Sequence, residues 1–128
     1  MVFIGHGPVF WSELGTLAPG ADRCYYQYGP IEKEGTVVEL IHQYPNLWVD
    51  LSASSGYYAA TRDIDFTRQF MNEFHDRIMF GTDICFARKP RELAIDLLEG
   101  LHADGMLSDE KYEAITHKNA ERLLKLDM

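Results

Sequence analysis

The chain has 128 residues, of which 46% are hydrophobic and 25% charged, and its formal net charge at pH 7 is −8. That length is typical of one domain with its own core, so residues 1–128 are interpreted as a single domain. The acidic balance and the lack of any basic run argue against nucleic acid or an anionic membrane as a partner. No apolar segment approaches the roughly 20 residues that span a bilayer.

The cysteines and the N-terminal residues indicate the compartment. Cys24 and Cys85 lie far apart in the chain and form no CxxC motif, which is typical of free thiols in a reducing environment. The first residues lack the basic region and the long apolar core of a signal peptide. We therefore predict a cytoplasmic protein.

Apolar runs alternate with segments of helical periodicity along the chain. Such alternation predicts an α/β fold with parallel strands joined by right-handed crossovers. With helices on one side only, the other face of the sheet would be left apolar and open. The predicted elements, in chain order, are a strand over 2–5, a helix over 9–17, a long loop over 18–35, a helix over 36–44, a strand over 46–52, a loop over 53–56, a helix from 63 or 65 to 74, a strand over 77–83, a loop over 84–89, a helix from 90 to 104 and a last helix over 115–126.

Polar side chains stand where each predicted strand ends. They are His6 after the first strand, Asp50 and Ser52 in the second, and Thr82 and Asp83 in the third. Because the carboxyl ends of parallel strands meet at one edge of a sheet, these side chains should come together there. A histidine and an aspartate at such an edge can bind a divalent metal or act as a base and its partner. The alternative is that both are simply hydrogen-bonded strand-end residues, since two ligands fall short of the three usual at a catalytic zinc.

Four segments of the sequence resemble the carboxyl-terminal part of the amidohydrolase-related family of metal-dependent hydrolases and decarboxylases. The GTD and NAERLL elements are the most specific of them. The matching segments are FIGHGPVFW (3–11), YPNLWVDLSASSGYYAATRD (44–63), RIMFGTDI (77–84) and ITHKNAERLLKL (115–126).

The resemblance implies a (β/α)8 TIM barrel, of which this chain would supply the last three βα units with their parallel strands and flanking helices. It implies that Asp83 ends strand eight as a metal ligand or a proton-shuttling carboxylate. By its distance from Asp83, His6 is placed on strand six, where the family histidine transfers protons near the metal. A strand-five position, as a direct metal ligand, is the alternative. Asp50 would lie within strand seven and support structure.

The sequence departs from the family pattern in one important respect. The family carries a His-x-His pair at the end of strand one, and no such pair occurs here. The other four histidines are interpreted as surface or boundary residues. Roughly half a barrel would be absent, and an open sheet edge has to be covered. We therefore expect a homo-oligomer or association with a missing N-terminal half.

The function that this resemblance implies is metal-dependent hydrolysis of a small carboxylated or cyclic substrate, with a decarboxylase as a related option. His6 and Asp83 would be the catalytic residues and would bind the metal, with zinc preferred and manganese as the alternative. From their expected positions near the same edge, Trp11 and Tyr57 could line a substrate pocket, and Arg88 could hold a substrate carboxylate. The competing hypotheses are a non-catalytic half-barrel that needs a partner chain, and an unrelated α/β binding module.

Overall fold

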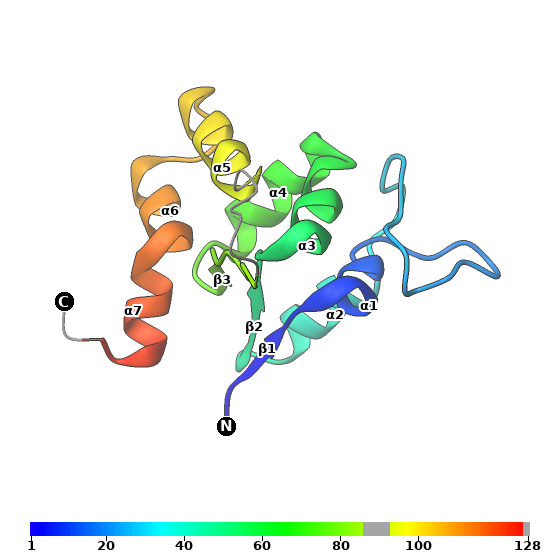
Figure 1. The fold of residues 1–128 in the computed structure, drawn as a ribbon, viewed down its shortest axis with the longest axis horizontal. Helices are drawn as coiled ribbons and strands as arrows, with labels where there is room; N and C mark the ends of the chain where they lie inside the picture. The colour runs from blue at the N-terminus through cyan, green and yellow to red at the C-terminus, as the bar shows by residue number, and fades with distance from the viewer. Residues whose placement is uncertain (86–92, 127–128) are drawn as a thin grey trace.

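A computed structural model describes residues 1–85 and 93–126 of the chain (Figure 1). It is a mixed α/β structure with a small parallel sheet and flanking helices, which confirms the predicted fold class at that level. The elements are β1 (Phe3–Gly5), α1 (Gly7–Ser12), α2 (Thr36–Gln43), β2 (Leu47–Asp50), α3 (Ala53–Thr61), α4 (Ile64–Phe74), β3 (Ile78–Met79), α5 (Leu93–Ala103), α6 (Asp109–Glu113), the π-helix η1 (Ala114–Lys118) and α7 (Asn119–Leu124).

The three strands pair in the order β1-β2-β3, and both pairings are parallel. Gly5 lies beside Val49, and Val49 lies beside Ile78. The last strand is shorter than the predicted range 77–83, because the backbone N–H of Phe80 already donates to Ile115 O at 2.8 Å rather than to a strand. The carboxyl ends of all three strands therefore reach the same edge of the sheet.

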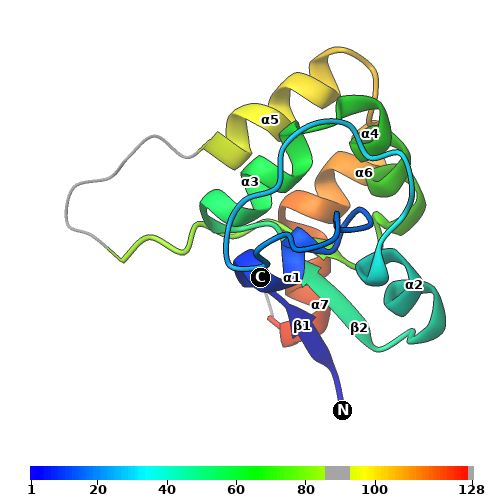
Figure 2. The ribbon, with the colours of Figure 1, turned by 90° about the vertical axis from the view of Figure 1, so that its right-hand side faces the viewer.

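The two faces of β2 differ in burial. Val49 and Leu51 are 1% exposed and belong to the core, whereas Trp48 and Asp50 are only half-buried. Successive strand residues point to opposite faces, so helices cover one face while the other stays partly open. Ile4 pairs with Trp48 on this open face and is 49% exposed. Figure 2 shows β1 at the margin of the molecule beside β2.

The helix α3 is the main departure from the expected elements. The sequence Ala53-Ser54-Ser55-Gly56 was expected to form a loop because serine and glycine are poor helix formers, but it forms the first turn of α3. Gly56 explains the packing. A Cβ at this position would lie 2.8 Å from the carbonyl carbon of Leu51, so only glycine lets the helix lie directly against the end of β2.

Helix lengths also differ from expectation at both ends of the chain. The first helix ends at Ser12 rather than at residue 17, although Leu14 beyond it is still 1% exposed. The last helix begins earlier than residue 115. Ser108 caps α6, where its side chain accepts a hydrogen bond from Lys111 N–H, and α6, η1 and α7 follow one another without a break. The predicted start of the preceding helix at Pro90 lies outside the described residues.

Within the described residues, no helix combines the length and the apolar character needed to cross a membrane.

Candidate functional site

His6 and Asp50 reach the carboxyl edge of the sheet by simple alternation along their strands. His6 follows β1 two residues after Ile4, and Asp50 follows Trp48 by two residues in β2. Since side chains alternate with a period of two, both residues continue the open face. The backbone of His6 is extended (φ −153°, ψ 155°) although it directly precedes α1, which keeps this alternation intact.

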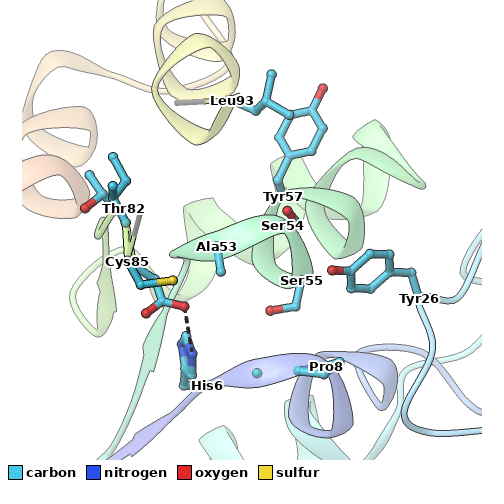
Figure 3. Close-up of a pocket in the computed structure, with 13 residues that line it drawn as sticks. His6, Pro8, Tyr26, Ala53, Ser54, Ser55, Tyr57, Thr82, Cys85 and Leu93 are labelled. Atoms are coloured by element: carbon cyan, nitrogen blue, oxygen red, sulfur yellow. Dashed lines mark ion pairs between the residues drawn. The ribbon is translucent and has the colours of Figure 1, made fainter. Parts of the chain in front are cut away.

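The imidazole of His6 lies between two carboxylates. Its Nδ1 is 3.3 Å from Asp50 Oδ2. Its Nε2 is 3.7 Å from Asp83 Oδ2, and a dashed line marks this ion pair in Figure 3. Asp50 is held by Ser52, whose hydroxyl donates to Oδ2 at 2.9 Å and whose backbone N–H donates to Oδ1 at 2.8 Å. Nδ1 thus lies 3.3 Å from both Asp50 Oδ2 and the Ser52 hydroxyl, and Nε2 is the imidazole nitrogen that faces Asp83.

The third strand approaches Asp50 closely at its end. A Cβ on Gly81 would lie 3.1 Å from both Asp50 Oδ1 and Ser52 Cβ, so a side chain here would press on the residues that hold His6. Two residues later Asp83 adopts a left-handed backbone conformation with φ 49°. Non-glycine residues in this region are strained by about 1–3 kcal/mol and cluster at functional sites. The strain turns the chain just where Asp83 faces His6.

A cavity of about 340 Å³ opens beside this histidine, within the range of small-molecule sites. Most of its wall comes from the His6–Pro8 turn, the first turns of α3 and residues 82–85 after β3, and Tyr26 and Leu93 complete it (Figure 3). The predicted substrate residue Tyr57 lines it. The lining residues are His6, Gly7, Pro8, Tyr26, Ala53, Ser54, Ser55, Tyr57, Thr82, Asp83, Ile84, Cys85 and Leu93.

The other two predicted substrate contacts, Trp11 and Arg88, have different outcomes. Trp11 is 2% exposed and packs in the core, where its indole N–H donates to the backbone carbonyl of Asp50 at 3.1 Å. Trp11 therefore does not line this cavity, because the turn of α1 that carries it faces β2; it anchors Asp50 from beneath. Arg88 lies outside the described residues.

Comparison with known proteins identifies the family. Residues 31–126, most of the chain, match the family model described as Amidohydrolase. This chain belongs to the amidohydrolase family. Asp50, Tyr57 and Asp83 fall inside the matched region of this amidohydrolase, whereas His6 precedes it. No curated protein and no solved structure matches the chain.

The metal expected of an amidohydrolase has no complete ligand set here. Among residues 1–85 and 93–126, no group of three or more His, Cys, Asp or Glu side chains could hold a metal ion. His6 and Asp83 have suitable donor chemistry for zinc, but a catalytic zinc commonly takes three protein ligands. The described part of this chain alone therefore does not fit the ion.

Sequence reasoning missed two further polar residues of the cavity, Tyr26 and Ser55, and gave Asp50 only a structural role. Asp50 had a usable signal, because its alternation with Trp48 places it on the same face as His6. Tyr26 and Ser55 had none, since one lies in the long loop and the other in a segment that was expected to be a loop. The sequence pattern does not indicate how these two segments fold against each other.

Proposed function

We propose that this chain forms the carboxyl-terminal part of an amidohydrolase-type (β/α)8 barrel and takes part in metal-dependent hydrolysis of a small carboxylated or cyclic substrate. The strand order supports the barrel, because consecutive parallel strands are neighbours in chain order. A doubly wound sheet reverses its strand order at a switch point, and no reversal occurs among the described strands. The partly open second face of the sheet would then face the barrel interior.

The observation that carries this proposal is the position of His6 between Asp50 and Asp83 on the cavity wall. In the proposed reaction, Asp50 holds the Nδ1 side of the ring, and His6 exchanges a proton with the substrate through Nε2. The Asp83 side chain is 54% exposed and can accept a proton from an attacking water. A decarboxylase of the same family would need a similar proton donor, so it is the second candidate activity.

The divalent ion is the part of this proposal that needs ligands from elsewhere. We propose that zinc, or else manganese, binds where His6 and Asp83 meet further ligands from outside the described residues, either on a second copy or on another chain that supplies the rest of the barrel. His6 and Asp83 provide only two metal ligands, so no chemical step is assigned to the ion here. Without such a partner the chain would be a non-catalytic half-barrel, which is the alternative form of the proposal.

The edge strand β1 supports association with such a partner. Val2, Phe3 and Ile4 are 46%, 56% and 49% exposed, and Phe3 and Ile4 point to opposite faces. An apolar strand open on both faces is a ready template for another strand. Both cysteines are free and exposed, which supports the cytoplasm as the place where the assembly works.

Turnover of a substrate panel tests the proposed activity. The purified chain, supplied with zinc or manganese, is assayed against carboxylated amides, lactones and aromatic carboxylates. Asp83→Asn and His6→Ala should each lower turnover by about 10²-fold or more, with unchanged circular dichroism. His117→Ala is the control, because His117 is an exposed histidine in η1; this variant should have the same turnover as the unmodified chain. Equal turnover in Asp83→Asn, or none in the unmodified chain with any substrate, would contradict catalysis by this chain.

A further inference from the structure

Ser55 is a largely buried residue whose hydroxyl has no hydrogen-bond partner among the described residues. It is 4% exposed, yet it lines the cavity beside His6. Figure 3 shows its hydroxyl directed away from α3 into the space between the helix and the His6–Pro8 turn. No fully buried side-chain oxygen or nitrogen of the described residues lacks a hydrogen-bond partner, so the Ser55 oxygen is not sealed inside the protein but opens onto the cavity. Its position on the cavity wall leaves it available to a bound molecule.

The N-terminus of α3 opens into the same space. The first N–H groups of a helix have no partner within the helix, and Ser52 at the N-cap position makes no side-chain bond to them. Its hydroxyl is used instead by Asp50 and lies 3.3 Å from His6 Nδ1. The backbone N–H groups of Ala53, Ser54 and Ser55 therefore have no acceptor among the described residues. This end of the nine-residue helix also has the positive end of the helix dipole.

Tyr26 adds a second hydroxyl from the opposite side. Its ring stacks on Tyr58 with 4.9 Å between ring centroids, and its hydroxyl is directed toward Ser55 (Figure 3). Within residues 1–85 and 93–126 this hydroxyl has no hydrogen-bond partner either. Two hydroxyls and the backbone donors of a helix terminus thus line one part of the cavity, next to His6 and Asp83.

We infer that this part of the cavity, formed by the α3 N-terminus with the hydroxyls of Ser55 and Tyr26, binds a carboxylate group of the substrate. Backbone N–H groups and hydroxyls are good donors to a carboxylate. A single negative charge suits the site better than a phosphate dianion, because Asp83 lines the same cavity and the described donors include no cationic side chain. The inference rests on the proposed function, since it names the substrate group that would be held while the rest of the molecule extends toward His6.

Binding of benzoate tests this inference without any need for turnover. We expect benzoate, titrated into the ¹⁵N-labelled chain at pH 7, to shift the amide resonances of Ala53, Ser54 and Ser55 in a saturable manner. Benzamide, which is similar in shape but neutral, should not shift them at the same concentrations. Ser55→Ala and Tyr26→Phe should each weaken benzoate binding by about 10-fold, the usual effect of losing one hydrogen bond to a charged group. Tyr25→Phe is the matched control, because Tyr25 lies in the same loop but is 71% exposed; it should bind as the unmodified chain does.

Thermal unfolding separates a binding role of Ser55 from a structural one. Because its hydroxyl has no partner among the described residues, Ser55→Ala removes no hydrogen bond within the protein and should leave the melting temperature unchanged. The inference is overturned if benzoate shifts no amide at the start of α3, if Ser55→Ala binds benzoate as well as the unmodified chain does, or if inorganic phosphate binds there more tightly than benzoate. Benzoate binding without hydrolysis would contradict the proposed activity alone, and hydrolysis without benzoate binding would contradict this inference alone.

Discussion

At the scale of single residues, Asp50 determines how His6 presents its ring. Ser52 donates to both carboxylate oxygens of Asp50, and Trp11 donates to its backbone carbonyl, so the side chain has little freedom to turn. A carboxylate held in this way favours the tautomer of the neutral imidazole that carries its proton on Nδ1. In that tautomer, Nε2 is the nitrogen that can receive a substrate proton on the side of Asp83.

Asp50→Asn tests this arrangement directly. An amide at position 50 can donate to Nδ1, so we expect the His6 tautomer to shift from Nδ1–H toward Nε2–H, while the fold is kept. Imidazole ¹⁵N chemical shifts at a pH where His6 is neutral report the tautomer. An unchanged tautomer in Asp50→Asn would mean that Asp50 does not orient the ring.

Strand periodicity was enough to predict from the sequence which polar side chains meet at the edge of the sheet, although their roles remain predictions. His6, Asp50, Ser52 and Asp83 meet because parallel strands end together, which the pattern of apolar runs already implies. Trp11 was wrongly expected on the cavity wall, since an aromatic side chain in a short helix can turn to either side. Only its hydrogen bond to the Asp50 carbonyl reveals which side it takes.

At the scale of elements, the close contact between α3 and β2 positions the cavity wall. Gly56 permits this contact, and the sequence pattern could not predict it, because Ser-Ser-Gly is equally compatible with a turn. Tertiary packing overrides the weak helix propensity of this segment. The position of Ser54 and Ser55 beside His6 depends on it.

Gly56→Ala should therefore destabilise the protein. The added Cβ would lie 2.8 Å from the backbone of Leu51, and overpacking of this kind typically costs about 1–3 kcal/mol. Gly100→Ala is the matched control, because it lies within α5 with no atom within 4 Å of the added Cβ; it should stabilise by about 0.5–1 kcal/mol. Urea denaturation measures both variants. Equal stability of Gly56→Ala and the unmodified chain would show that α3 is not packed as described.

Asp63 connects the long loop to α4. Its Oδ1 accepts from Phe66 N–H at 3.0 Å as the helix N-cap, and its Oδ2 accepts from Ile31 N–H at 2.8 Å. The hydrogen bonds from Phe66 and Ile31 lower the pKa of this carboxyl below its ordinary value. The sequence predicted the start of this helix at residue 63 or 65, but not the contact with the loop, because loops have no periodicity from which to predict a partner.

Asp63→Ala should reduce the free energy of unfolding at neutral pH by about 1 kcal/mol, the usual cost of losing an N-cap. Since the pKa is lower in the folded state, the stabilisation is present above the unfolded pKa of about 4 and is lost as the pH falls through the folded value. The difference between Asp63→Ala and the unmodified chain should thus shrink in acid. Urea denaturation at pH 7 and pH 3 measures it, with Asp65→Ala in the same helical turn as the control. If the stability difference between Asp63→Ala and the unmodified chain stays constant or grows in acid, the hydrogen bonds from Phe66 and Ile31 to Asp63 do not stabilise the fold as described.

At the scale of the whole molecule, the sheet is too small to close on itself. The number of strands, their parallel order and the partly open face were predictable from the alternation of apolar runs and helices. What covers the exposed strand β1 was not, because the residues of an interface depend on a surface that another chain contributes. We therefore treat association as part of the proposed function: the ligands that His6 and Asp83 lack would come from the partner that covers this edge.

Zinc content, determined by elemental analysis together with the molecular mass in solution, tests the central claim most directly. The account predicts that the chain associates, and that the assembly holds about one zinc per site, as the usual three-ligand catalytic zinc requires. Asp83→Ala and His6→Ala should each lose this zinc while remaining folded. Zinc that both variants retain, or a folded monomer that neither associates nor binds zinc, would contradict the claim that His6 and Asp83 form part of a metal-dependent hydrolase site.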